Sequence, residues 1–171
     1  MKYLPLASNT GLYPDIIVAE MKLLAAEGHL RRGELPLAAA EIDFSRVGSG
    51  GLPPLVGSTA ASDTTQAVPG ASACVPLVPY GGASGLKCGR MWEALKWEKR
   101  VELMFTGANQ WYFDSRGWGD LINGTPLQYP VPYQEMDARY GASVNRFYNL
   151  GGDVNGGASS ATKNTYGNFG F

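Results

Sequence analysis

Apolar residues recur at helical spacing over residues 14–32, the first strongly periodic segment of the chain. Pro14 and Asp15 suit the start of a helix, and Gly33 stands where a left-handed residue commonly ends one. The apolar residues form two neighbouring stripes: Ile16, Ala19, Leu23, Ala26 and Leu30 in one, and Ile17, Met21 and Leu24 in the other. An apolar arc this wide predicts a helix that packs against more than one neighbour.

A second helix is predicted over residues 35–47. Pro36 falls in its first turn, and Gly48 follows its last residue. Small residues dominate its seam, namely Ala38, Ala39 and Ala40 beside Ile42. Because only Gly33 and Glu34 separate the two helices, we expect them to pack antiparallel, as in one helix-turn-helix repeat unit.

The composition changes abruptly over residues 48–89 to Gly, Pro, Ser, Ala and Thr. No regular element longer than a turn is expected there, and the segment is interpreted as an insertion with partial order. That order depends on Cys74 and Cys88. A disulfide between them would close a loop of about 15 residues and stabilise the fold by about 3 kcal/mol. It is favoured over two separate buried thiols, provided that the compartment is oxidising.

Helical periodicity returns over residues 90–106, where one apolar face holds Ala94, Trp97, Val101 and Met104, with Leu95 and Phe105 beside it. A shorter helix is expected over 109–116, and a last helical fragment over 134–139. Residues 151–171 form a Gly-rich, low-complexity tail that we expect to be mobile. The pattern predicts an all-α domain over residues 1–150, with long irregular loops and the insertion at about 48–89.

Composition and charge exclude several classes of function. The 14 basic residues are balanced by 15 acidic ones, which argues against a nucleic-acid-binding protein. One histidine and two cysteines cannot form a four-ligand Cys/His zinc site, and no Gly-rich nucleotide loop is present, so neither a metal nor a cofactor is expected. Every apolar stretch is too short for a membrane span. Low charge with many glycines and aromatic residues is typical of secreted or surface proteins.

Two blocks of the sequence carry a resemblance to a known family. In the first, residues 17–55, the helix pair is followed by an Arg, a Gly and a Leu-Pro. The second block is residues 92–136. It contains, in this order, a Glu and an Arg, then Glu-Leu, then an aromatic residue with an Asp, then Trp-Gly, and finally Pro-x-Pro. In their order and spacing, the two blocks resemble the carboxy-terminal half of the SusD/RagB family of outer-membrane nutrient-binding lipoproteins.

The resemblance implies a tetratricopeptide-like helical scaffold at the cell surface of a Gram-negative bacterium. Such a protein captures a glycan or similar nutrient and passes it to a SusC-like TonB-dependent transporter, without catalysis. Family members are much longer and begin with a signal peptide and a lipidated cysteine, which this sequence lacks. We therefore expect a carboxy-terminal portion or a truncated member, with the lipid anchor in a full-length parent.

Aromatic residues are the candidates for ligand binding. Trp111, Tyr112, Phe113 and Trp118 cluster in the sequence with polar neighbours, and sugars stack their apolar faces on such rings. The same spacing suits core packing, which is the favoured alternative for Trp111 and Phe113. Tyr80, between Pro79 and two glycines, is the further candidate, and a structural role as a loop anchor is equally compatible with its position.

Glu98 and Glu102 lie one helical turn apart, which allows two interpretations. A glycoside hydrolase needs a pair of carboxyls flanking one sugar bond. The favoured interpretation is structural: the two carboxylates form ion pairs with cations such as Arg46 or Arg116 that hold helices together. A helical scaffold that only binds another protein is the main alternative to nutrient binding, and the hydrolase is the least favoured.

Overall fold

The computed structural model of the protein describes residues 16–80, 85–104, 106, 110–126, 134, 135 and 138. The chain divides into two compact units, residues 1–110 and 111–171. The described part is helix-rich, with four α-helices and one two-stranded sheet. Of the helical fragment expected over 134–139, the described residues 134, 135 and 138 are helical. The tail from 151 and the domain boundary expected at 150 lie outside the described residues.

The first two helices form the expected antiparallel pair: α1 (Val18–Arg31) and α2 (Leu35–Arg46). Gly33 has a φ of +75°, and the Glu34 amide donates to the carbonyl of His29 at 2.9 Å. The left-handed residue predicted at this position is thereby confirmed. α1 begins at Val18, later than the periodicity indicated, because Ile17 is extended.

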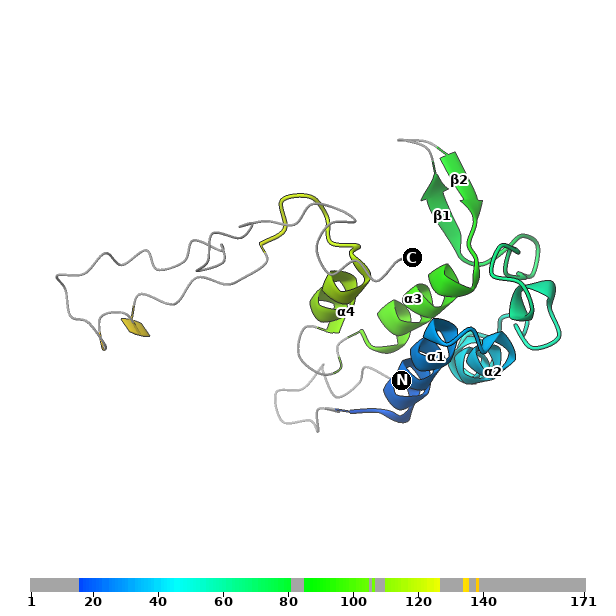
Figure 1. The fold of residues 1–171 in the computed structure, drawn as a ribbon, viewed down its shortest axis with the longest axis horizontal. Coiled ribbons are helices and arrows are strands. Elements are labelled where there is room, and N and C mark those ends of the chain that lie inside the picture. The colour runs from blue at the N-terminus through cyan, green and yellow to red at the C-terminus, as the bar shows by residue number, and fades with distance from the viewer. Residues whose placement is uncertain are drawn as a thin grey trace. The chain divides into compact units, whose positions relative to one another are not determined.

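The third helix, α3 (Met91–Glu102), packs on both members of the pair (Figure 1). Its buried apolar face is Met91, Ala94 and Leu95. The expectation is confirmed for Ala94 and Leu95 and was wrong for Trp97, Val101 and Met104, which are exposed. Phe105 lies outside the described residues. The polar side chains of Lys99 and Glu102 occupy the buried side instead.

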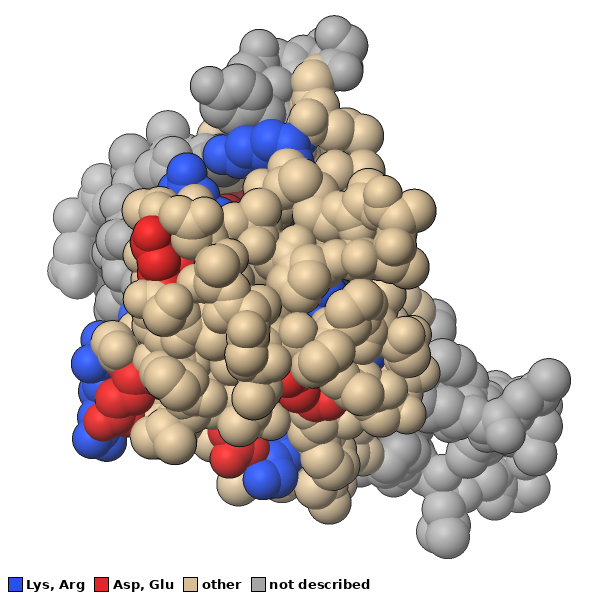
Figure 2. Space-filling view, turned by 90° about the vertical axis from the view of Figure 1, so that its right-hand side faces the viewer, with Lys and Arg blue, Asp and Glu red and all other residues tan. Residues whose placement is uncertain are grey.

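Segment 48–89 contributes to the core. The apolar cluster has members from all three helices and from this segment: Leu23, Ala26, Leu30, Leu35, Ala38, Ala39, Ile42, Leu55, Ala60, Ala61, Val68, Met91, Ala94 and Leu95. Gly70 is required where the segment turns back, because a Cβ there would lie 1.5 Å from the Ala73 carbonyl oxygen. Residues 48–86 carry one charged side chain, Asp63, and the face of the molecule in Figure 2 is largely uncharged.

The prediction that segment 48–89 holds no element longer than a turn was wrong. It contains a short 3-10 helix (Thr59–Ala61) and an antiparallel hairpin of β1 (Leu77–Tyr80) and β2 (Gly85–Cys88). The predicted Cys74–Cys88 disulfide is present at the base of this hairpin. Composition did not indicate the strands because Pro79 and Gly85 are poor strand formers, and the disulfide braces a hairpin that would be marginal alone.

The last helix, α4 (Gln110–Trp118), starts at the boundary of the two units, close to the start and end expected from sequence. Gly119 follows it with a φ of +75°. In the second unit, Leu121 is buried and Tyr112 packs against it. Among the described residues, no helix combines the length and the apolar character needed to cross a bilayer.

Candidate functional site

Arg46, the last residue of α2, has a fully buried side chain with 0% exposure. Its guanidinium donates to three backbone carbonyls of the following segment: Nε to Pro53 at 2.9 Å, Nη1 to Val75 at 2.9 Å, and Nη2 to Pro69. The planar fork of an arginine can reach several acceptors at once, which a lysine cannot. One side chain thus connects three points of segment 48–89 to the helix pair.

Asp43, one turn earlier on α2, holds the start of the same segment. Its carboxylate oxygens accept from the amides of Leu55 at 2.8 Å and Val56 at 2.9 Å. Sequence reasoning missed Asp43, because no local spacing indicates a bond to residues 12 and 13 positions further along. With Arg46 and the disulfide, it makes the Gly/Pro/Ser-rich segment a preformed structure with fixed attachment points.

Glu98 lies between α2 and α3 and accepts a hydrogen bond from the Ser45 hydroxyl at 3.0 Å. Burial raises its pKa, and the Ser45 hydrogen bond and the charge of Arg46 partly oppose that shift. Burial also lowers the pKa of the Arg46 guanidinium, against the effect of Glu98 and Asp43. Glu98 therefore acts on Arg46 as a nearby charge, while the Arg46 guanidinium donates its hydrogen bonds to the carbonyls of Pro53, Val75 and Pro69.

The expected ion pairs of Glu102 and Arg116 stay predictions. Glu102 is almost completely buried on α3, and Arg116 is half-buried on α4. Glu98 and Glu102 both face the packed side of α3. Because a glycosidase needs its two carboxyls on either side of a bound sugar, this orientation gives no support to the hydrolase interpretation.

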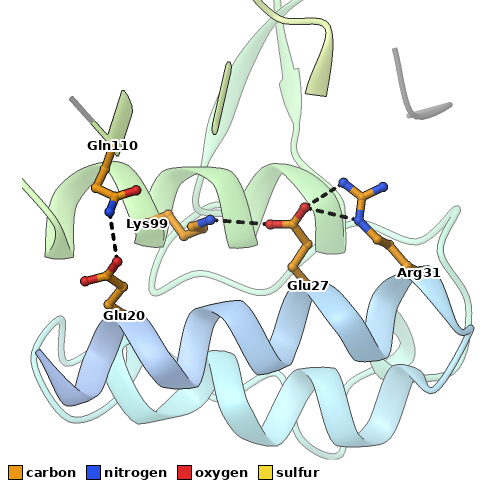
Figure 3. A network of polar contacts seen from close by, with 5 residues as sticks. All are labelled: Glu20, Glu27, Arg31, Lys99 and Gln110. Atoms are coloured by element: carbon orange, nitrogen blue, oxygen red, sulfur yellow. Dashed lines mark hydrogen bonds and ion pairs between the residues drawn. The ribbon is translucent and has the colours of Figure 1, made fainter. Parts of the chain in front are cut away.

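A polar network between α1 and α3 was not expected from the sequence (Figure 3). The nearly buried Lys99 ammonium lies 3.3 Å from Glu27, and Glu27 also accepts two hydrogen bonds from Arg31, at 2.6 and 3.1 Å. A separate contact lies at the other end of α1, where Gln110, the first residue of α4, donates to Glu20 at 2.9 Å. The i,i+4 spacing of Glu27 and Arg31 is a signal that sequence reasoning could have used. The network aligns α3 on α1.

The aromatic candidates divide by exposure. Trp111 is 54% exposed and Phe113 is similarly exposed, so the favoured expectation that these two are core residues was wrong. Trp118 is only 2% exposed and offers no free face for stacking. Tyr112 is half-buried, its hydroxyl donates to the Pro126 carbonyl at 2.9 Å, and its ring meets Phe113 edge-on. Trp111 and Phe113 are thus the accessible rings of this group, and Trp111 is the one on the first turn of α4.

Tyr80 is the last residue of β1 and pairs with Gly85; its side chain lies outside the described residues. Across the part of the chain that the structure describes, no group of three or more His, Cys, Asp or Glu side chains could hold a metal ion. Comparison with known proteins gives no further assignment: no family model, no curated protein and no solved structure matches this chain significantly.

Proposed function

We propose that the chain is the carboxy-terminal portion of a SusD-like nutrient-binding protein of the outer membrane. In this proposal it helps to capture a glycan or similar nutrient at the cell surface and delivers it to a SusC-like TonB-dependent transporter, with no chemistry of its own. The ligand-binding candidates are Trp111 and Tyr112 on α4 and Tyr80 at the hairpin, while Trp118 serves as a buried support.

The observation that carries the proposal is a physical link inside the first of the two resembling blocks. Arg46 is the Arg that ends the helix pair, and Leu52 and Pro53 are the Leu-Pro that follows it. Arg46 donates from its side chain to the Pro53 carbonyl at 2.9 Å and accepts at its own carbonyl from the Leu52 amide at 3.0 Å. The residues of this motif therefore contact one another through hydrogen bonds, which explains their spacing in the sequence.

The outer side of the helix pair supports a tetratricopeptide-like arrangement. Away from the core, α1 exposes Val18 and Met21, and α2 exposes Leu37 and Phe44. The ion pair between Lys22 and Glu41, at 2.9 Å, connects the two helices. A helix pair with two apolar faces is what a stack of such pairs needs, because each pair buries one face against each neighbour.

Calorimetric titration with a broad panel of oligosaccharides tests the proposal, using this chain and its longer parent. We expect saturable heat with at least one sugar, and weakening of at least tenfold in Trp111→Ala. Phe44→Ala is the matched control, since Phe44 is an exposed aromatic residue of the other unit and should leave the affinity unchanged. No heat with any sugar, in chain or parent, would count against nutrient binding.

A helical scaffold that binds only another protein is the second candidate, favoured by the exposed apolar side of the helix pair. Co-purification with the TonB-dependent transporter distinguishes the two. If the complex forms equally with wild-type protein and Trp111→Ala, and no sugar binds either one, the scaffold interpretation is preferred.

A further inference from the structure

The β1–β2 hairpin extends from the helical part of the first unit (Figure 1). Its register pairs Leu77 with Cys88, Val78 with Lys87, Pro79 with Leu86 and Tyr80 with Gly85. All four residues of β2 are exposed. A two-stranded ribbon has two edges, and each edge can accept a further strand unless something blocks it.

The backbone direction of each residue follows from one hydrogen bond next to the hairpin. The Gly89 amide donates to the Pro76 carbonyl at 2.9 Å, so residues 76 and 89 turn their backbone groups toward each other. Along an antiparallel pair, residues whose backbone N–H and C=O groups face the partner strand alternate with residues whose groups point away from it. Val78 and Lys87 therefore also face each other, while Leu77 and Pro79 on β1, and Leu86 and Cys88 on β2, direct their backbone groups to the outer edges.

The two outer edges differ chemically. On β1, Pro79 has no N–H, so that edge cannot provide a regular ladder. On β2, Leu86 and Cys88 each offer an N–H and a C=O, and no hydrogen bond to these groups is found within the described parts of the chain. The edge of β2 is therefore the one that can accept a strand.

The side chains add an apolar surface beside that edge. Because side chains alternate along a strand, Leu77, Pro79, Leu86 and the Cys88 half of the disulfide share one face of the ribbon. Leu86 is 65% exposed and Leu77 is 45% exposed. Val78, on the opposite face, is buried. The inner face thus fixes the hairpin to the molecule, and the outer face leaves apolar side chains in water.

We propose that the edge of β2 binds an extended segment of another protein, which adds as a third strand. Backbone hydrogen bonds to Leu86 and Cys88 supply the ladder, and apolar side chains at alternate positions of the segment cover Leu86 and Leu77. A second copy is the alternative occupant of this edge, and its binding would appear as a dimer in the sedimentation measurement below. This site uses the outward backbone groups of β2 and not Tyr80, the nutrient-binding candidate at the end of β1.

The test measures binding of a labelled, soluble heptapeptide of alternating valine and serine to the oxidised chain by fluorescence anisotropy. The control probe is the same peptide with N-methyl groups on the residues of one edge, which removes its ladder donors and keeps its side chains. We expect saturable binding of the unmodified peptide and at least tenfold weaker binding of the methylated one, the equivalent of about 1.4 kcal/mol.

Matched variants locate the site on the protein. Leu86→Pro removes an outward N–H of β2 and should weaken binding at least tenfold. Leu77→Pro makes the same backbone change on the other edge and removes only apolar contact with the segment, so it should weaken binding less than Leu86→Pro does. Amide spectra of Val78 and Lys87 verify that the hairpin still forms. Leu86→Thr keeps the N–H, removes apolar surface, and should give an intermediate affinity.

Three results would overturn the proposal. The first is no binding of the unmodified peptide up to millimolar concentration. The second is equal binding of the N-methylated peptide, which needs no protein variant to interpret. The third is a concentration-dependent dimer in sedimentation that disappears in Leu86→Pro, because the edge would then be occupied by a second copy.

Discussion

Replacing Arg46 by methionine removes the donor for three partly buried carbonyls and keeps most of the volume of the side chain. Each buried carbonyl left without a donor costs about 1–3 kcal/mol. Methionine avoids the cost of burying a cation, which offsets part of that loss. Three such losses, less that offset, lead us to expect the free energy of unfolding to fall by about 3–5 kcal/mol.

Chemical denaturation measures this loss, and hydrogen exchange shows where it acts. In Arg46→Met, amides of segment 53–76 should lose protection more than those of α1, because the carbonyls held by Arg46 belong to Pro53, Pro69 and Val75. Arg32→Met is the control: the Arg32 side chain is 72% exposed, so its replacement should cost less than about 0.5 kcal/mol. A loss below about 1 kcal/mol in Arg46→Met, with unchanged exchange, would refute the argument.

Four further changes have expected outcomes. Removing the disulfide by Cys74→Ser with Cys88→Ser should cost about 3 kcal/mol in denaturant unfolding, and an unchanged midpoint would contradict its role. The pKa of Glu98 is raised in the folded state, so stability should rise as pH falls from 7 toward the unfolded value of 4.5, and Glu98→Gln should abolish that rise in melts across this range. Leu23→Ala, in the core, should cost about 2–5 kcal/mol, which thermal melts would show. Gly33→Ala, at a φ of +75°, should cost about 1 kcal/mol by the same measurement, and a gain in stability would be inconsistent with the left-handed turn.

Local patterns predicted the helices well. The α1–α2 pair, its tight turn at Gly33 and the start of α4 followed from periodicity and end signals, because these depend on residues a few positions apart. The disulfide also followed from composition. The hairpin did not, since its strands are four residues each and are stabilised by the disulfide at their base and one buried valine.

The candidate site could be predicted only in part, because its decisive features are contacts between distant residues. The sequence indicated that Arg46 and Glu98 have structural roles. It did not indicate that the Arg46 guanidinium donates hydrogen bonds to backbone carbonyls up to 29 positions away. Trp111 and Trp118 look alike in the sequence, yet one is exposed and the other is buried. Seven positions apart on α4, they lie on nearly the same side of the helix, so helical position alone does not distinguish them.

The indole N–H signals of the four tryptophans provide the most direct test of the nutrient-binding account. A nitrogen-15-labelled sample of the chain is titrated with the oligosaccharides, and Trp111→Phe assigns its signal. The account predicts a saturable shift of the Trp111 indole with at least one sugar, while the signal of the buried Trp118 moves less. If no indole signal moves at millimolar sugar, or if Trp97 alone responds, the proposed ligand site on α4 is wrong.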